Sequence, residues 1–355
     1  MNEYQQWTCD VLVVGAGPAG SAAARFAARK GVSVILLERR EKVGLPVRCA
    51  EYVPLPISQY VELKRPGILV QAVRAMQTFI PGDFVKETAV PGAMINRDRL
   101  DQELADLAIE AGALLKTSIQ AWTRQGEEVV ARGKEGLIKI SSRAIIGADG
   151  PSSQVARWMG NGHKEFLIAV QYRVSLRKPL DHTRIYFCPY IQGGYGWLFP
   201  KGNEANLGVG IVPSLHKSLK KILDQFRMEL IQGGMIEDEI KGLGGGLLPV
   251  GGLTKVAKEN MILAGDAAGT CHPITGAGVG NALISGEMAG EAAAEAVRKD
   301  DLRQLQAYEQ ELIGALGHSL NHGVRKRKAM MAQWDSLNFS ETIRHNWIAF
   351  SEYYE

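Results

Sequence analysis

The 355-residue sequence has few cysteines and no long apolar run, and each absence excludes a class of protein. Its four cysteines, at positions 9, 49, 188 and 271, show neither a C-x-x-C pair nor any other cluster spacing. This argues against an iron–sulfur site and against a scaffold held by disulfides, and no metal site is predicted. No segment reaches about 18 uncharged apolar residues, so no membrane-spanning helix is expected.

Neither sign of charge dominates the composition. The formal net charge is +3, which gives the chain no general affinity for nucleic acid. Apolar residues make up 46% of the sequence and charged residues 22%, as in ordinary globular proteins. The first residues lack the basic and apolar regions of a signal peptide. We therefore expect a globular, cytoplasmic protein with two intertwined lobes and an extension.

Residues 10–20, Asp-Val-Leu-Val-Val-Gly-Ala-Gly-Pro-Ala-Gly, are the most informative stretch that is present. They predict an apolar strand that turns through glycines into an Ala-rich helix over 18–30, followed by a second strand ending at Glu38. Gly15 permits the tight turn, Gly17 lets the backbone approach a pyrophosphate, and Gly20 lets the helix pack on the sheet. Glu38 can accept hydrogen bonds from ribose hydroxyls. The predicted nucleotide contacts are Gly15, Gly17, Pro18, Ala19, Gly20, Glu38 and Arg39.

Two later segments favour FAD over NAD as the nucleotide. One strand ends in Asp149-Gly150. Another ends in Gly265-Asp266, before a glycine-rich turn and a long Ala-rich helix that begins near Ala277. A carboxylate at a strand end can hold a polyol, and a helix N-terminus points N–H groups at an electron-rich edge. A flavin offers both partners, in its ribityl chain and its N1/O2 edge, whereas NAD has no ribityl chain.

The three segments resemble, in this order, the GxGxxG, DG and GD signatures of FAD-dependent enzymes of the aromatic hydroxylase fold. This resemblance implies that Arg97, at the head of a helix, contacts the cofactor between its two nucleotide parts. Asp149 either fixes the turn around Gly150 by local hydrogen bonds or contacts the cofactor directly. The flavin-facing residues that the resemblance implies are Gly265, Asp266, Pro273, Gly276, Ala277, Gly278 and Val279.

A narrower resemblance lies in the middle of the chain. Residues 193–202, Gly-Gly-Tyr-Gly-Trp-Leu-Phe-Pro-Lys-Gly, are similar to the YxWxFP segment of the geranylgeranyl reductase family. Gln192 stands where family members often have proline. Residues 48–51, Arg-Cys-Ala-Glu, are similar to a second segment of that family. The resemblance implies hydride delivery from reduced flavin to isolated C=C bonds of a hydrophobic prenyl substrate, with further cofactor contacts from Arg48, Cys49 and Ala50.

The aromatic residues of the YxWxFP segment alternate with other residue types. This puts Tyr195, Trp197 and Phe199 on one face of a strand. That face is either the core of a sheet or the wall of an apolar pocket that holds a chain against the flavin and excludes water.

The cysteines near the flavin also leave two interpretations open. Cys49 is either a packed thiol or, activated by the neighbouring Arg48, the group that supplies the proton completing alkene reduction. Cys271 is likewise either packed or redox-active. The predicted catalytic residues are Cys49, Tyr195 and Trp197.

The predicted fold is α/β, with a Rossmann-like FAD-binding lobe, an inserted antiparallel-sheet substrate lobe and a C-terminal helical extension. The FAD-binding lobe takes residues 1–55, 95–160 and 255–300, the substrate lobe 56–94 and 161–254, and the extension 301–355. A helix over 216–233 interrupts the sheet. Because no second glycine-rich βαβ unit is found, electrons are expected from a transiently docked donor such as reduced nicotinamide or ferredoxin.

Residues 325–328, Arg-Lys-Arg-Lys, lie beside Met330, Met331 and Trp334 in the extension. The run is either a solvated helix face or a peripheral contact with the inner face of a membrane, where cations bind anionic lipid and Met and Trp insert.

Two function classes follow from these patterns. The first is an FAD-dependent reductase of C=C bonds in a polyprenyl lipid or prenyl tail. The alternative is a flavin-dependent monooxygenase of an aromatic or polyketide-type molecule on the same fold, in which reduced flavin reacts with oxygen. The resemblance to YxWxFP favours the reductase.

Overall fold

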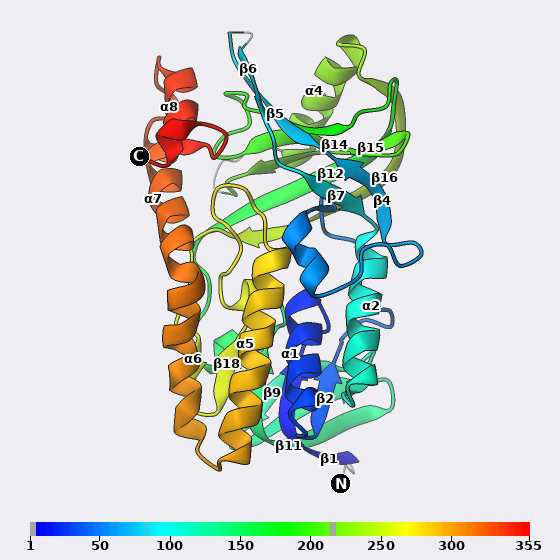
Figure 1. Cartoon of the computed structure of the whole chain (residues 1–355), viewed down its shortest axis with the longest axis vertical. Helices are drawn as coiled ribbons and strands as arrows, with labels where there is room; N and C mark the ends of the chain where they lie inside the picture. The colour runs from blue at the N-terminus through cyan, green and yellow to red at the C-terminus, as the bar shows by residue number, and fades with distance from the viewer. Residues whose placement is uncertain (1–4, 83, 214–217) are drawn as a thin grey trace.

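The computed structural model describes residues 5–82, 84–213 and 218–355. Figure 1 shows two halves: the lower one packs long helices against one sheet, and the upper one is dominated by a second sheet. The last long helical stretch of the chain runs along one edge of both halves.

The first sheet has eight strands and contains the parallel core that the glycine fingerprint predicts. β1 (Gln5–Val14) pairs in parallel with β2 (Val34–Leu37) on one side and with β11 (Gly136–Gly147) on the other. Residues 11–14 and 34–37 are all buried, as expected of strands covered on both faces. The other strands are β8 (Leu114–Lys116), β9 (Gln120–Gln125), β10 (Glu128–Gly133), β17 (Ala257–Lys258) and β18 (Met261–Leu263).

Helices α1 (Pro18–Arg29) and α5 (Val279–Arg298) pack on each other through small residues and lie side by side in Figure 1. A Cβ on Gly286 would lie 2.2 Å from the Ala19 carbonyl oxygen, and one on Gly290 would lie 2.3 Å from that of Ala23. The contacts follow the same order along both helices, so the helices run parallel and their N-termini lie at one end of the pair. The predicted helices over 18–30 and from near Ala277 are thus confirmed. The other helices of this half are α2 (Arg97–Glu110), α3 (Gln154–Trp158) and η2 (Gly265–Ala267).

The second sheet has seven strands in the order β16-β12-β15-β14-β13-β5-β6. The expectation of an antiparallel sheet is right for five of its six pairings and wrong for one, because β5 and β13 run parallel. The predicted helix over 216–233 is found as α4 (Leu219–Gln232), and its first two predicted residues lie outside the described residues. The strands are β5 (Ala75–Ile80), β6 (Phe84–Thr88), β12 (Phe166–Leu176), β13 (His182–Tyr186), β14 (Tyr195–Lys201), β15 (Glu204–Ile211) and β16 (Ile236–Pro249).

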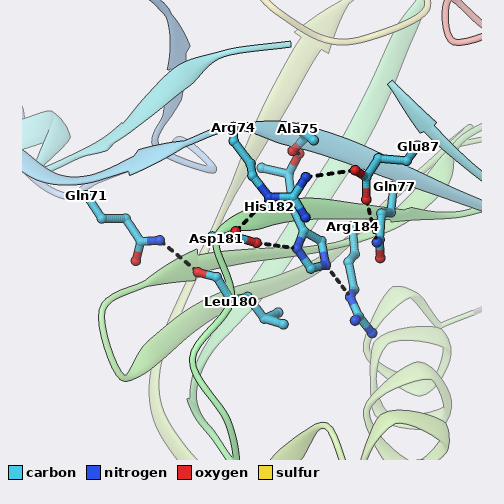
Figure 2. A network of polar contacts seen from close by, with 10 residues as sticks. Gln71, Arg74, Ala75, Gln77, Glu87, Leu180, Asp181, His182 and Arg184 are labelled. Carbon is cyan, nitrogen blue, oxygen red and sulfur yellow. Dashed lines mark hydrogen bonds and ion pairs between the residues drawn. The ribbon is translucent and has the colours of Figure 1, made fainter. Parts of the chain in front are cut away.

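A polar network holds the parallel β5–β13 pair together (Figure 2). Arg74 forms ion pairs with Asp181 at 2.6 Å and with Glu87 at 2.7 Å. Its backbone N–H also donates to the Asp181 carbonyl. Asp181 contacts His182 Nδ1 at 2.8 Å, and Arg184 donates to His182 Nε2. Two segments about a hundred residues apart are thereby joined into one sheet.

A small third sheet lies between these parts. It consists of β3 (Tyr52–Pro54), β7 (Gly92–Ile95) and β4 (Leu69–Val73), with η1 (Leu55–Gln59) following β3. β7 leads directly into α2, so this sheet positions the α2 N-terminus.

The C-terminal residues are helical, as predicted, and pack on both halves. Tyr308 of α6 donates its hydroxyl to the Leu263 carbonyl of the first sheet. The inward face of α7 places Met330 in a cluster with Trp197 of β14, and Trp334, just after α7, joins the same cluster. None of the helices in the described part of the chain is long and apolar enough to span a membrane. The elements are η3 (Leu302–Gln304), α6 (Leu305–Leu312), a π-helical turn (Ile313–Gly317), α7 (His318–Ala332), α8 (Phe339–Asn346) and η5 (Ser351–Tyr353).

Candidate cofactor and substrate site

The three fingerprint glycines have different surroundings. Gly15 has φ +99°, and a Cβ there would lie 2.5 Å from the Ala148 carbonyl oxygen. A Cβ on Gly20 would lie 1.7 Å from the Gly15 carbonyl oxygen. Gly17, which caps α1 before Pro18, has no heavy atom of the described residues within 4 Å of a Cβ built on it. Gly15 and Gly20 therefore serve the chain's own packing, while Gly17 leaves one side open, as a phosphate cradle requires.

Glu38 follows the end of β2 and is half-buried. Its carboxylate accepts hydrogen bonds from the backbone N–H groups of Ala16, at 3.1 Å, and Arg40, at 3.0 Å. These bonds hold the carboxylate beside the glycine turn and leave acceptor capacity for ribose hydroxyls. The neighbouring Arg39 is exposed.

Asp266 lies in η2, and no described residue donates a hydrogen bond to its carboxylate. Burial raises its pKa to about 6, although Arg97 attracts the charged form. A Cβ on Gly278 would lie 3.4 Å from Asp266 Oδ1, so the carboxylate lies beside the start of α5. A half-buried carboxylate without protein donors fits the role of accepting hydrogen bonds from the ribityl chain of a flavin.

The turn from Pro273 to Gly278 is held by the second sheet. Tyr195 of β14 donates its hydroxyl to the Thr275 carbonyl. Gly276 has φ +68°, and a Cβ there would lie 2.9 Å from a Leu248 methyl group. Ala277 closes the turn by accepting the His272 N–H, and Gly278 caps α5, whose first residue is Val279. The structure therefore joins the predicted flavin-facing turn to the predicted aromatic strand.

The carboxylate of Asp149 is engaged in hydrogen bonds within its own turn. Its carboxylate accepts hydrogen bonds from the Ser153 hydroxyl and from the backbone N–H groups of Gln154 and Val155, at the start of α3. Of the two interpretations of Asp149, the structure favours the one in which it fixes the turn around Gly150. Direct cofactor contact by this carboxylate is not supported.

The cation beside Cys49 is Arg97 rather than Arg48. Burial lowers the pKa of Arg97, but the attraction of Asp101 and of the Cys49 sulfur outweighs burial and raises it above its ordinary value. Arg97 Nε lies 2.6 Å from Asp101 Oδ1. Arg48 is exposed, so the structure favours Arg97 over Arg48 as the cation that faces Cys49, and activation of the thiol by Arg48 stays a prediction. Cys49 itself is half-buried.

Trp197 is only 7% exposed, whereas Tyr195 and Phe199 of the same strand face are half-buried. A Cβ on Gly208 of β15 would lie 2.2 Å from Trp197 Cζ2, so this glycine makes room for the indole. Ala50 packs against the same cluster. The predicted catalytic residues Cys49, Tyr195 and Trp197 thus belong to neighbouring parts of one region.

Sequence reasoning missed a buried ion pair in this region. Glu51 and Lys201 lie 2.6 Å apart, with side chains only 2% and 9% exposed. Asn206 donates a hydrogen bond to the same carboxylate at 3.0 Å. The sequence feature that could have indicated this ion pair is Lys201, a charged residue at the end of a strand otherwise expected to be buried.

The basic run at 325–328 does not support lipid insertion by its neighbours. Arg327 is 5% exposed, and Met330 and Trp334 are buried in the protein. Lys326 donates hydrogen bonds to backbone carbonyls in the C-terminal segment. The expectation that Met330 and Trp334 insert into a membrane is therefore wrong.

Comparisons with protein families match both halves of the chain. The profile described as FAD dependent oxidoreductase matches residues 10–151. The profile described as geranylgeranyl reductase catalytic domain matches residues 165–247, which include the aromatic strand.

Curated relatives are similar over most of the chain. One is digeranylgeranylglycerophospholipid reductase 1 of Methanococcoides burtonii, 35% identical over 340 residues, covering 88% of this chain and 81% of the relative. Another is the digeranylgeranylglycerophospholipid reductase of Methanocella arvoryzae, 33% identical over 343 residues, covering 90% of this chain and 87% of the relative.

Solved structures share the fold. A geranylgeranyl bacteriochlorophyll reductase-like protein from Thermoplasma acidophilum has a TM-score of 0.87 and 27% identity, covering 98% of this chain and 92% of that chain. A probable FAD-dependent monooxygenase from Pseudomonas aeruginosa has a TM-score of 0.72 and 16% identity, covering 95% of this chain and 99% of that chain. At that identity the second likeness shows the fold alone.

We expect FAD binding by the apoprotein to weaken as the pH falls through about 6, the pKa of Asp266. If a ribityl hydroxyl donates to the ionised carboxylate, binding below this pH must expel a proton, and affinity should fall about tenfold per pH unit. Isothermal titration of FAD between about pH 7.5 and pH 5 measures this. Asp266→Asn should bind more weakly at neutral pH, by about 1.5–3 kcal/mol, and should lose this component of the pH dependence.

Glu38→Ala is the matched control, because it should weaken FAD binding through the other end of the cofactor and keep the pH dependence.

The stability of the protein without FAD gives a second check. A raised pKa means that the stability contributed by Asp266 is fully present below its ordinary pKa and is lost as the pH rises through about 6. Apo Asp266→Asn should therefore be the more stable protein at neutral pH. An unchanged pH profile of FAD affinity in Asp266→Asn would contradict the assignment.

Proposed function

This chain belongs to the geranylgeranyl reductase family of FAD-dependent oxidoreductases, and we propose that it saturates C=C bonds in the prenyl chains of an isoprenoid lipid. The digeranylgeranylglycerophospholipid reductases that it resembles support this substrate class. One contact carries the proposal: Tyr195, on the aromatic strand, donates its hydroxyl to Thr275 of the flavin-facing turn. An aromatic apolar surface beside the flavin is what a reductase of unactivated alkenes needs.

Each part of the proposed site has a separate role. Glu38 and Asp266 would hold the ribose and ribityl hydroxyls, and the N-termini of α1 and α5 would stabilise the anionic parts of FAD. Bound and reduced, FAD supplies the hydride. Tyr195 and Trp197 orient the chain and exclude water. Cys49 donates the proton to the second carbon of the double bond, or orders the water that donates it.

The monooxygenase alternative has support from the fold alone. The monooxygenase structure in the comparison shares 16% of its sequence with this chain, whereas the reductases share 33–35%. The family profile over residues 165–247 also covers the substrate side of the fold rather than its nucleotide side. The reductase is therefore the better-supported activity.

The electron source and the cellular location are further parts of the proposal. Electrons come from a transiently docked donor, such as reduced nicotinamide or a ferredoxin, because the described residues contain one glycine-rich βαβ nucleotide unit. The enzyme works in the cytoplasm, at or near the inner face of the membrane that holds its lipid. A peripheral contact would rest on exposed residues such as Arg325, Lys328 and Leu337.

The activity is tested with FAD-loaded protein reduced by dithionite and mixed with a glycerophospholipid that carries geranylgeranyl chains. We expect mass spectrometry to show the gain of two hydrogen atoms for each double bond reduced, without oxygen incorporation. Protein stripped of FAD is the control. Absence of any saturated product, together with a C4a-hydroperoxide signal on exposure of the reduced protein to air, would favour the monooxygenase.

A pocket wall and a core position give Trp197 different mutational effects. As a wall, Trp197→Ala should abolish turnover and lower the thermal midpoint less than Phe226→Ala does, with the flavin spectrum intact. Phe226 is 1% exposed in a separate core, and its truncation should cost about 3–5 kcal/mol. Thermal melts of both FAD-loaded variants measure the difference. A loss of stability in Trp197→Ala equal to that in Phe226→Ala would overturn the assignment to a wall.

The role of Cys49 is tested by Cys49→Ala and Cys49→Ser with dithionite-reduced flavin. If the thiol supplies the proton, Cys49→Ala should lose about a hundredfold in turnover while its FAD content is unchanged. Activity in the serine but not the alanine variant would indicate hydrogen bonding to a donor water. Cys188→Ala, at the other half-buried cysteine, is the control. Full activity in Cys49→Ala would exclude the thiol as proton donor.

A further inference from the structure

Glu51 joins three elements through one buried carboxylate. Its side chain is 2% exposed. One oxygen accepts the backbone N–H of Arg97, the first residue of α2, at 3.0 Å. The other accepts Lys201 Nζ of β14 at 2.6 Å and Asn206 Nδ2 of β15 at 3.0 Å. The carboxylate therefore ties the 48–51 segment to the nucleotide-binding half and to the aromatic sheet at once.

The backbone of Glu51 has a left-handed conformation that residues other than glycine rarely adopt. The described residues include four non-glycine residues with positive φ: Glu51, Ser118, Glu259 and Asp300. Of these, only Glu51 is buried. A side chain in this left-handed conformation is strained relative to glycine. The hydrogen bonds and the ion pair of the carboxylate act against this cost and hold the side chain in place.

The bonds around Glu51 determine where the Cys49 thiol lies. The Glu51 backbone N–H donates to Cys49 Sγ at 3.2 Å. The carbonyl groups of Cys49 and Ala50 accept hydrogen bonds from Gln171, at 2.9 Å, and Asn206, at 3.1 Å. The second sheet thus holds each residue from 49 to 51. The N–H group that contacts the sulfur belongs to Glu51, the residue whose carboxylate is anchored.

Arg97 links the same anchor to the cation beside the thiol. Its backbone N–H donates to Glu51, while its guanidinium lies beside both Asp101 and the Cys49 sulfur. Displacement of Glu51 would therefore move both groups that contact the sulfur. Lys201 would at the same time be left as a buried cation without its carboxylate, which is costly.

We infer that Glu51 is the positioning residue of the active-site cysteine: its buried carboxylate, paired with Lys201, holds Cys49 and Arg97 in register with the aromatic strand. The catalytic part of this inference, that the positioned thiol acts in prenyl reduction, rests on the proposed function. The position of the thiol can nevertheless be measured without any prenyl substrate, so failure of the two ideas can be told apart.

The experiment compares Glu51→Gln with Glu259→Gln in FAD-loaded protein. Glu259 is a matched control because it is also a left-handed glutamate paired with an arginine, at 2.7 Å, but it is exposed and lies far along the chain. Iodoacetamide modification of each cysteine is followed by peptide mass spectrometry, with Cys188 as the internal reference. In Glu51→Gln we expect Cys49 to react about tenfold faster, the change expected for loss of one charge-assisted hydrogen bond. Prenyl turnover should fall, and Cys188 and Glu259→Gln should be unaffected.

A double variant, Glu51→Gln with Lys201→Gln, separates positioning from charge balance. It removes both buried charges and so avoids the lone cation that could unfold the single variant. If the carboxylate positions the loop, Cys49 should remain hyper-reactive and turnover low while the thermal midpoint recovers. Wild-type reactivity of Cys49 in the double variant would overturn the inference. Altered reactivity with no prenyl reduction by the wild-type protein would uphold it and refute the proposed activity instead.

Discussion

The close backbone contact between α1 and α5 is the constraint on which the rest of the structure depends. Gly286 and Gly290 let α5 approach carbonyl groups of α1 to distances that no side chain would allow. Gly265 continues this contact, since a Cβ there would lie 2.7 Å from the Ala19 Cβ. Two turns that are about 250 residues apart in sequence thereby lie at one end of a helix pair. A single extended cofactor can then contact both helix N-termini.

Polar bonds fix the second half of the molecule to this frame at particular points, in addition to apolar packing. Tyr195 bonds to the predicted flavin-facing turn, and Glu51 bonds to both the α2 N-terminus and Lys201. A buried ion pair gains little net stability, because removing both charges from water costs about as much as their attraction returns. Hydrogen bonds with fixed directions nevertheless specify one arrangement. We therefore expect these contacts to set the geometry of the site more than the stability of the fold.

The sequence predicted those elements in which a residue type or its spacing is explained by one local structural requirement. The glycine turns, the Ala-rich helices and the alternating aromatic strand were of this kind, and the structure confirms them as elements. It did not predict the parallel β5–β13 pair, because alternation specifies the faces of a strand and not its partner. Glu51 and Lys201 were missed for the same reason, since each appears polar and ordinary until the other lies beside it. The position of Arg97 beside Cys49 was also missed, because residues that are distant in sequence can be adjacent in space.

The aromatic strand is part of a core at Trp197, whereas Tyr195 and Phe199 on the same strand face are less buried. α7 and α8, with the residues that follow them, contribute Met330, Trp334 and Trp347 to the cluster that contains Trp197, so the indole is supported by the C-terminal helices. Tyr195 and Phe199, on the same strand face, remain half-buried. A wall that holds a flexible apolar chain must be rigid, because a mobile wall would lose the orientation that favours reaction. The C-terminal helices then hold one side of the indole, and Trp197 forms the proposed wall together with its half-buried neighbours Tyr195 and Phe199. The C-terminal helices are in this way part of the proposed substrate site rather than an addition to it.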